Sequence, residues 1–175
     1  MGKNLEIGNN GTLPWIGKFK KEFQYFIDTT NYIPDGVKNE SLKNAYLSGK
    51  PSPNEGLLDH SNHKYAIVSK TFEIPESMKS ESVERFYNIS DAVQWIESDP
   101  TINDLWIIGG TGIYSECLKN KICSKLYITR IDSDFKADRF FPNFDLVNFY
   151  YEKISESQPV YENGINYVFQ VWSRK

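Results

Sequence analysis

The apolar stretch LWIIGG, residues 105 to 110, constrains the fold more than any other segment of the chain. Its large apolar residues predict a buried strand, and the two glycines that end it predict a sharp turn. The next residues, TGIYSECLKN, place Ile113, Cys117 and Leu118 on one face of a helix. A strand that turns directly into a helix is typical of a parallel sheet, so the sequence predicts an α/β fold.

The rest of the chain continues this alternation of strands and helices. Further strands are predicted for apolar runs at residues 45 to 47, 65 to 69, 83 to 87 and 125 to 131. Helices are predicted for residues 18 to 30, where apolar side chains recur at helical spacing, and for SDAVQWIES, where Ser90 is the expected N-cap. We therefore predict a central, mainly parallel sheet with helices on both faces.

Two strand-like runs near the end of the chain, FYYEKIS and NYVFQVWSR, flank the segment PVYENG. Asn163-Gly164 within that segment is a good signal for a tight turn. The two runs therefore predict an antiparallel pair at the edge of the sheet. Because no linker or repeat divides the chain and its 175 residues suit one core, we expect a single domain over residues 1 to 175.

Composition narrows the classes of partner. The 20 Lys and Arg nearly balance the 23 Asp and Glu, and a net charge of −3 does not favour binding to nucleic acid or an anionic membrane. No apolar stretch approaches the roughly 20 residues that span a bilayer, and the N-terminal residues lack a secretory signal, so a cytoplasmic location is expected. The two cysteines and two histidines do not have the spacing of a zinc site, so no metal is expected.

The segment IGNNGTLPW, residues 7 to 15, is rich in turn-forming residues but ends in Leu13 and Trp15. A loop that only connects two elements is expected to be polar. The two large apolar residues therefore indicate that this loop covers another part of the protein or a ligand.

Two predicted strand ends carry residues that suit phosphate groups. Gly109 and Gly110 lead into a helix, whose first N–H groups favour an anion. Ser69 and Lys70 follow another buried strand, and their hydroxyl and ammonium groups suit a second phosphate. Simpler interpretations are a tight turn in the first case and a solvated lysine in the second, since the third glycine of the usual dinucleotide fingerprint is absent.

Glu22 borders the apolar face of the helix predicted for residues 18 to 30. A glutamate at such an edge usually reaches water or pairs with a lysine, here Lys18 or Lys21. The alternative is a position facing an apolar pocket, where the pKa of the carboxyl group rises and the group becomes suited to supplying a proton.

Several of these segments, taken together, resemble dihydrofolate reductase. The resemblance rests on the order and spacing of Ile7-Gly8 and GTLPW, KKEFQYF, LWIIGGTGIY, LYITRI with DRFFP downstream, and the closing GINYVFQVWSRK. These segments lie within residues 5 to 30 and 64 to 175, and the last is similar to the end of eukaryotic members. The combination is far more specific than any one segment.

The resemblance implies hydride transfer from NADPH to C6 of dihydrofolate, with a proton delivered to N5. Glu22 would bind the pterin through two parallel, charge-assisted hydrogen bonds, and Thr129 would keep the Glu22 carboxylate in place. Trp15 would position a water molecule beside the Glu22 carboxylate, and Tyr114 would lie near this site. The segment at residues 7 to 15 would be the mobile active-site loop.

The remaining implied roles concern binding of the two reactants. The implied substrate-binding residues are Ile7, Leu13, Glu22, Phe23, Phe26, His63 and Ile108. The implied cofactor-binding residues are Ile7, Gly11, Gly49, Lys50, Ser52, Ser69, Lys70, Gly109, Gly110, Thr111, Gly112 and Ile113. The resemblance also implies inhibition by antifolates and a monomeric protein.

Three departures from the family pattern lead us to expect impaired activity. Family members have an apolar strand before the equivalent of residues 4 to 7, and here Met1 stands almost where that strand should end, so a central strand is expected to be missing. Pro51 stands where the family has a basic residue, and Pro53 is expected to lie in or near the first turn of a phosphate-binding helix and to shorten it. His63 falls where the family uses an arginine for the glutamate tail of folate, and a neutral imidazole cannot form that bidentate pair.

Two other interpretations stay open. One is a non-catalytic or degenerate relative that binds a pterin or NADPH without turnover. The other is reduction of a related substrate on the same scaffold, as in the riboflavin-pathway reductase, against which Glu22 after LPW argues.

Overall fold

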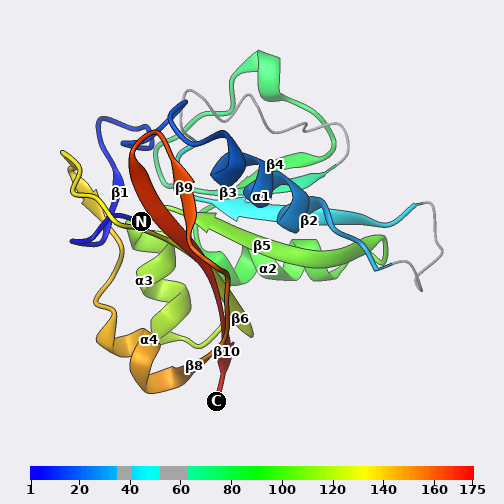
Figure 1. The fold of residues 1–175 in the computed structure, drawn as a ribbon. Helices are drawn as coiled ribbons and strands as arrows, with labels where there is room; N and C mark the ends of the chain where they lie inside the picture. The colour runs from blue at the N-terminus through cyan, green and yellow to red at the C-terminus, as the bar shows by residue number, and fades with distance from the viewer. Residues whose placement is uncertain (35–40, 52–62) are drawn as a thin grey trace. The chain divides into compact units, whose positions relative to one another are not determined.

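The computed structural model describes residues 1–34, 41–51 and 63–175. The chain forms two compact units, one of Met1–Phe23 with Gly110–Lys175 and one of Gln24–Gly109. Each unit contains its own four-stranded sheet (Figure 1). The α/β class is confirmed, and the single domain over residues 1 to 175 stays a prediction.

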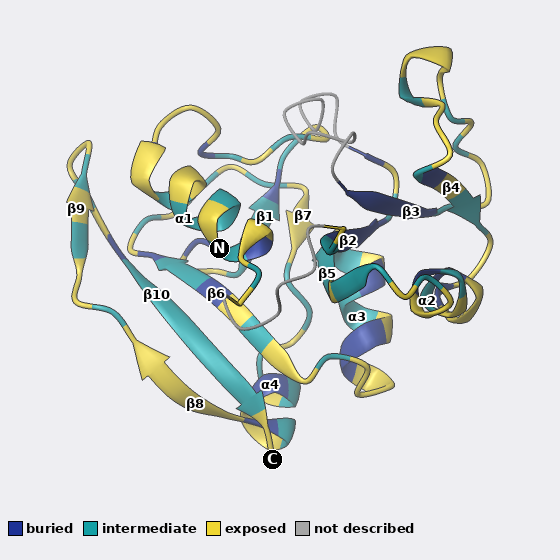
Figure 2. Cartoon of the chain, turned by 90° about the vertical axis from the view of Figure 1, so that its right-hand side faces the viewer, coloured by how far each residue is buried: buried dark blue, intermediate teal, exposed yellow. Residues whose placement is uncertain are grey.

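A parallel sheet organises the unit of Gln24–Gly109. Its strands, in the spatial order β4-β3-β2-β5, are β4 (Val83–Phe86), β3 (Lys64–Val68), β2 (Lys43–Ser48) and β5 (Ile102–Gly109). These are the strands that the apolar runs predict. Tyr46, Tyr65 and Ile67 are fully buried on β2 and β3, which Figure 2 shows as the most buried strands of the sheet. The same unit contains a short 3₁₀ helix, η2 (Glu76–Met78), and the helix α2 (Ile89–Glu97).

Helix α2 begins two residues earlier than an N-cap at Ser90 would place it, and the prediction of Ser90 as its N-cap is wrong. The N-cap is Asn88, whose side-chain oxygen accepts a hydrogen bond from the backbone N–H of Asp91 at 2.9 Å. Asparagine and serine are equally good N-caps, and Asn88 comes first in the chain. Ser90 therefore lies inside the first turn.

An antiparallel sheet organises the other unit. Its strands are β6 (Lys125–Ile131), β8 (Tyr151–Glu156), β9 (Val160–Glu162) and β10 (Ile165–Arg174), and β10 pairs with the other three. Two short strands form a separate antiparallel pair, β1 (Glu6–Gly8) with β7 (Arg139–Phe140). The helices are α3 (Thr111–Lys119), α4 (Asp145–Tyr150) and the beginning of α1 (Lys20–Asn31).

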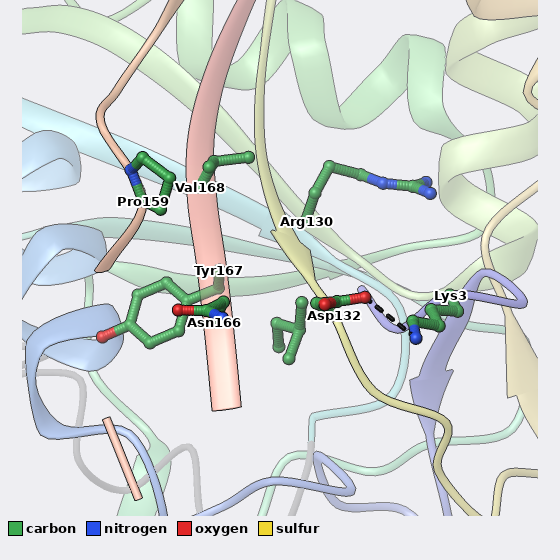
Figure 3. A pocket seen from close by; sticks show the side chains of 8 residues that line it. Lys3, Arg130, Asp132, Pro159, Asn166, Tyr167 and Val168 are labelled. Carbon is green, nitrogen blue, oxygen red and sulfur yellow. Dashed lines mark ion pairs between the residues drawn. The ribbon is translucent and has the colours of Figure 1, made fainter. Parts of the chain in front are cut away.

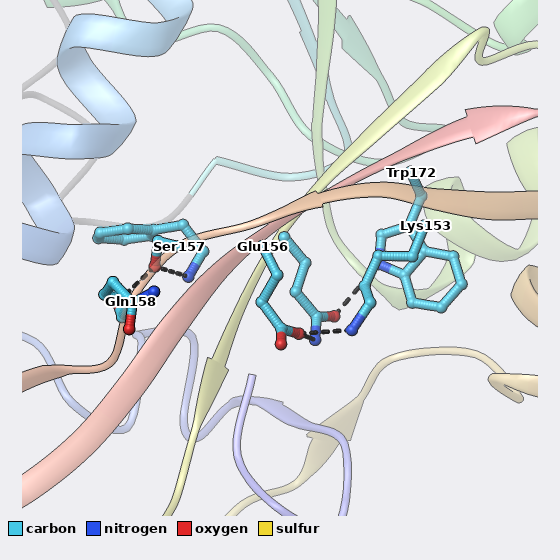
Figure 4. Close-up of polar contacts among 7 residues, drawn as sticks. Lys153, Glu156, Ser157, Gln158 and Trp172 are labelled. Atoms are coloured by element: carbon cyan, nitrogen blue, oxygen red, sulfur yellow. Dashed lines mark hydrogen bonds and ion pairs between the residues drawn. The ribbon is translucent and has the colours of Figure 1, made fainter.

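The C-terminal antiparallel pair is confirmed by the pairing of β8 with β10. The tight turn is confirmed as well, because Asn163 and Gly164 both have positive φ, 51° and 81°. The run FYYEKIS is only partly a strand, since its first two residues end α4. Polar contacts hold the exposed edge of this sheet, where the Glu156 carboxylate accepts hydrogen bonds from Lys153 at 2.7 Å and Gln170 at 2.5 Å (Figure 4).

Two apolar clusters form the core of the antiparallel unit. One consists of Trp15, Phe19, Ile131 and Tyr167, and the other of Leu118, Val147 and Tyr151. The apolar face expected for α3 is confirmed, because Ile113, Cys117 and Leu118 are the buried residues of that helix. The first cluster joins Ile131 of β6 and Tyr167 of β10 to Phe19, the residue that directly precedes α1.

Two of the strands at the ends of the sheets are β5 and β6. Among the described residues, β5 of the parallel sheet pairs with the single strand β2, and β6 of the antiparallel sheet pairs with the single strand β10. Met1 makes two backbone hydrogen bonds to β6: its amine donates to the Thr129 carbonyl at 2.5 Å, and its carbonyl accepts from the Ile131 N–H at 3.0 Å. None of the described helices has the length and apolar character to cross a membrane.

Candidate active site

Glu22 lies in the first turn of α1 and is half-buried. Burial of its carboxylate raises the pKa above the ordinary glutamate value, while the nearby Met1 amine, Thr129 and Trp15 act in the opposite direction. No lysine in the described part of the chain lies within ion-pair distance of Glu22. Of the two interpretations of this residue, the structure therefore agrees with the partly desolvated carboxylate rather than the surface ion pair.

Trp15 is almost fully buried beside Glu22. Its ring packs against Phe135, with ring centroids 5.2 Å apart, and it belongs to the cluster with Phe19, Ile131 and Tyr167. The indole N–H interacts with the Glu22 carboxylate strongly enough to lower its pKa, but it has no hydrogen-bond acceptor at direct bonding distance among the described residues. A buried donor next to a carboxylate suits a polar ligand atom or a water.

Thr129 reaches Glu22 from the middle of β6. The pairing of Thr129 with Phe169 on β10, the hydrogen bond that the Thr129 carbonyl accepts from the Met1 amine, and the hydrogen bond from the Ile131 N–H to the Met1 carbonyl fix the backbone at this point. Its side-chain hydroxyl interacts with the Glu22 carboxylate and lowers the pKa of that group. The structure therefore brings together Trp15, Glu22 and Thr129, three of the four predicted catalytic residues.

The Met1 amine is the only positive group that lowers the pKa of Glu22 within the described chain. Burial is the main cause that lowers the pKa of this amine to about 5, and Arg130 contributes in the same direction. Glu22 in turn raises the pKa of the amine, so each of the two groups favours the charged form of the other.

The fourth predicted catalytic residue, Tyr114, lies on α3. Its ring packs against Phe141 with centroids 5.5 Å apart, and its backbone N–H donates to the Gly110 carbonyl at 3.0 Å. The structure places it at the first turn of α3, beside the predicted pyrophosphate site. Its role in a reaction stays a prediction.

The loop at residues 7 to 15 contains a tight hairpin turn. Asn9 and Thr12 exchange backbone hydrogen bonds at 2.8 and 3.1 Å, and the two residues between them, Asn10 and Gly11, have φ values of 50° and 78°. This conformation explains the asparagine and glycine, which adopt positive φ most easily. Leu13 after the turn is 40% exposed, whereas Trp15 is buried in the core.

The N-terminus of α3 has the features expected of a phosphate site. Its N-cap is Gly110, and no side chain caps the helix. A Cβ added at Gly110 or at Gly112 would meet no atom within 4 Å, so the backbone here is open to a ligand. The Thr111 hydroxyl donates to the Phe140 carbonyl at 2.8 Å, while the Ile113 side chain is buried in the core.

Other predicted cofactor residues lie at the carboxyl ends of the parallel strands in the unit of Gln24–Gly109. Gly49 after β2 donates its N–H to the carbonyl of Gly109 on β5 at 2.7 Å. Ser69 follows β3, and its hydroxyl accepts hydrogen bonds from the N–H groups of Thr71 and Phe72 at 3.3 and 3.1 Å. The side chains of Lys50 and Lys70 are exposed. Because these strands are parallel, their carboxyl ends share one edge of the sheet.

The predicted substrate-binding residues of the same unit differ in exposure. Phe26 on α1 and Ile108 on β5 are half-buried. His63 is buried before β3, where its Nε2 lies 2.8 Å from the Asn31 side-chain oxygen and 3.4 Å from the Tyr46 hydroxyl. His63 is thus engaged with neighbouring side chains, and its contact with a folate tail stays a prediction. Ser52 and Pro53 lie outside the described residues.

Among the predicted substrate residues of the antiparallel unit, Phe23 is 39% exposed and Ile7 is half-buried on β1. This unit also has an open pocket of about 520 Å³ lined by residues from β6 and β10 together with Lys3, Asp132 and Pro159 (Figure 3). None of the predicted site residues lines that pocket, and its Lys3 ammonium is paired with Asp132 at 2.9 Å. We therefore assign it no part in the site.

Sequence reasoning missed two residues that support the site, Glu162 and Tyr167. Glu162 accepts hydrogen bonds from the backbone N–H groups of Lys20 and Lys21, and from the Tyr167 hydroxyl. These residues are about 140 positions apart in the sequence, so no local pattern connects them. The Asn163-Gly164 turn next to Glu162 was the only sequence signal near this contact.

Comparison with known proteins identifies the family. A family model described as dihydrofolate reductase matches residues 61–174, which is more than half of the chain. The chain belongs to the dihydrofolate reductase family. A dihydrofolate reductase of Heliothis virescens is 31% identical over 180 residues, which cover 98% of this chain and 92% of that protein.

Other dihydrofolate reductases align over similar lengths. The protein of Mus musculus is 29% identical over 191 residues, covering all of this chain and 94% of that protein. A viral dihydrofolate reductase of Saimiriine herpesvirus 2 is 32% identical, covering 98% of this chain and 81% of that protein. The dihydrofolate reductase family relationship thus extends over nearly the whole chain, including the residues around Glu22.

Proposed function

We propose that the protein catalyses the NADPH-dependent reduction of 7,8-dihydrofolate to 5,6,7,8-tetrahydrofolate, with hydride transfer to C6 and protonation at N5. The observation that carries this proposal is the half-buried Glu22 carboxylate, with its raised pKa, next to Trp15 and Thr129. Membership of the dihydrofolate reductase family supports the same chemistry.

Glu22 is the group that binds and orients the pteridine ring. An ionised carboxylate matches an amidine-like edge with two parallel hydrogen bonds, and these fix the ring in one orientation. Thr129 holds the carboxylate from β6, so that its orientation is set before substrate binds. The buried indole N–H of Trp15 provides a further donor for a substrate atom or for a water that passes a proton.

The raised pKa of Glu22 bears on proton supply. A carboxyl group whose pKa lies nearer to neutrality is protonated in a larger fraction of molecules at the working pH, which suits it to general acid catalysis. The proton then moves from the protonated Glu22 carboxyl to N5 of the substrate, directly or through a water that Trp15 orients, and leaves Glu22 ionised. We expect the rate to fall as pH rises above the pKa of Glu22.

The residues that would hold NADPH fit an anionic, phosphate-bearing molecule. The open backbone at Gly110 and Gly112, without a side-chain cap on α3, suits the pyrophosphate, with Thr111 and Ile113 completing the turn. In the other unit, Ser69 and the exposed Lys70 suit the 2′-phosphate, and Gly49 and Lys50 lie at the same strand edge. When bound, NADPH supplies the hydride.

A spectrophotometric assay with and without an inhibitor tests this function. Purified protein with NADPH and dihydrofolate is expected to lose NADPH absorbance, and methotrexate is expected to block that loss. Glu22→Gln is expected to reduce kcat/KM by about 100-fold or more, the usual contribution of a positioned acid or base. Asp28→Asn, which removes a charge from the exposed side of the same helix, serves as the matched control and is expected to keep normal rates.

The alternative of a non-catalytic relative gives a different result in the same experiment. Thermal stabilisation by NADPH without turnover would favour a binding protein, and the absence of both responses would favour a degenerate chain. Inhibition by antifolates, a monomeric state and a cytoplasmic location also belong to this proposal. Gel filtration at micromolar concentration tests the monomer.

A further inference from the structure

We propose that Glu162 is a positioning residue for Glu22: from strand β9 it caps the first turn of α1 and thereby sets the place and the charge environment of the Glu22 carboxylate. This inference rests on the proposed role of Glu22. Nothing in the family resemblance assigns a role to Glu162, and the contact joins parts of the chain that are far apart in the sequence.

The first turn of α1 needs an external cap. The first N–H groups of any α-helix have no partner within the helix, and the residue before α1 is Phe19, whose side chain has no acceptor. Glu162 supplies the acceptors instead. Its Oε1 accepts from the Lys20 N–H at 2.9 Å, and its Oε2 accepts from the Lys21 N–H at 3.3 Å.

Two neighbours hold Glu162 in this position. Tyr167, which is almost fully buried on β10, donates its hydroxyl hydrogen to Glu162 Oε2 at 2.7 Å. Asn163 donates from its side chain to the Lys18 carbonyl at 2.5 Å, which ties the hairpin turn to the chain just before α1. The hydrogen bond from Tyr167 is also the main cause that lowers the pKa of Glu162, so its carboxyl is ionised at neutral pH.

The cap acts on Glu22 through the backbone. Glu22 directly follows Lys20 and Lys21, and its own N–H interacts with the Tyr167 hydroxyl. The residues whose N–H groups bind Glu162 and Tyr167 are therefore the ones that determine where the Glu22 side chain leaves the helix. A displacement of this turn moves the carboxylate relative to Trp15 and Thr129.

The cap also acts on Glu22 through its charge. The titratable groups that face Glu22 are the Met1 amine, Glu162 and Tyr167. Of these, the Glu162 carboxylate raises the pKa of Glu22, and the amine lowers it. Neutralising Glu162 is therefore expected to let Glu22 ionise at lower pH.

The test compares Glu162→Gln with Glu152→Gln, an exposed glutamate of β8 that serves as control. A glutamine keeps the shape and one acceptor oxygen, but it places an NH₂ group where the other carboxylate oxygen accepted from a backbone N–H. We expect hydrogen exchange at the Lys20 and Lys21 amides to become about fivefold faster, the size of a lost helix cap. We also expect the pH dependence of kcat/KM to move to lower pH, with Glu162→Asp recovering part of both effects.

A readout without turnover separates this inference from the proposed function. In protein labelled with ¹³C at glutamate carboxyl groups, the Glu22 resonance is identified by its loss in Glu22→Gln. Its titration is expected to move to lower pH in Glu162→Gln and to stay in place in Glu152→Gln. Unchanged titration and unchanged amide exchange in Glu162→Gln would overturn the inference, whether or not the wild-type protein reduces dihydrofolate.

Discussion

The Tyr167 hydroxyl donates a hydrogen bond to Glu162 at 2.7 Å, and this contact joins strand β10 to the carboxylate that caps α1. Tyr167 is 1% exposed and belongs to the apolar cluster with Trp15, Phe19 and Ile131. The ring and the hydroxyl of one residue therefore serve two purposes. The ring fills the core beneath the candidate site, and the hydroxyl holds the cap.

Tyr167→Phe separates these two purposes, because it keeps the ring and removes the hydroxyl. We expect the free energy of unfolding in urea to fall by about 1 to 2 kcal/mol, since a hydrogen bond to a charged group is lost within the protein. Tyr161→Phe, an exposed tyrosine of the same hairpin, is the control and is expected to change stability by less than about 0.5 kcal/mol. Equal stability of the two variants would show that the Tyr167 hydroxyl contributes nothing.

The N-cap of α2 gives a second prediction. Asn88→Ala removes the acceptor for the Asp91 N–H and is expected to cost about 1 kcal/mol of unfolding free energy. Ser90→Ala, inside the first turn, is expected to cost little because alanine is the better helix former. Thermal unfolding of both variants checks this, and a larger loss for Ser90→Ala would contradict the assignment of the cap.

The difference between Asn88 and Ser90 illustrates what the sequence can and cannot predict. Apolar runs such as LWIIGG and KLYITRI predicted their strands because burial leaves a pattern in neighbouring residues. The N-cap was missed because two good capping residues stand two positions apart, and only the surrounding structure selects one. Phe149 and Tyr150 were assigned to a strand because aromatic residues favour strands in general, whereas here they end a helix.

In the candidate site, too, the sequence does not predict contacts between residues that are far apart in the chain. Trp15, Glu22 and Thr129 were predicted together because the segments around them resemble one family, and the structure brings them together. The cap by Glu162 was not predicted, because its partners Lys20 and Lys21 are backbone donors that leave no trace in side-chain type. Short pairs such as β1 with β7 were also missed, since two or three residues carry no periodicity.

The stability at acid pH of the unit of Gln24–Gly109, which contains the parallel sheet, is expected to depend on Asp99. Hydrogen bonds from Thr101, with a further contribution from Lys64 at 3.3 Å, lower the pKa of Asp99 from 3.8 to about 2. A carboxyl whose pKa is lower in the folded protein stabilises the fold when ionised, and that contribution disappears as pH falls from about 4 towards 2. Asp99→Asn is therefore expected to have a flatter dependence of Tm on pH over this range than the wild type. Parallel curves for the two proteins would contradict this prediction.

Glu22 is expected to have the opposite effect on stability. Its pKa is raised in the folded protein, so the folded state binds the proton more tightly than the unfolded chain. Stability is therefore lost as pH rises from the ordinary glutamate range through the raised pKa. Glu22→Gln is expected to have a higher Tm than the wild type at pH 7 to 8, and the same Tm well below pH 4. A variant that is less stable than the wild type at neutral pH would contradict a desolvated Glu22.

The central claim is that this chain reduces dihydrofolate at a site organised by Glu22. The most direct test uses NADPH carrying deuterium in place of both hydrogens at C4 of the nicotinamide and follows dihydrofolate by NMR and mass spectrometry. We predict tetrahydrofolate with one deuterium at C6, formed by the wild type and by Asp28→Asn, and formed about 100-fold more slowly by Glu22→Gln. Oxidation of NADPH without deuterium at C6, or equal rates for the wild type and Glu22→Gln, would contradict the claim.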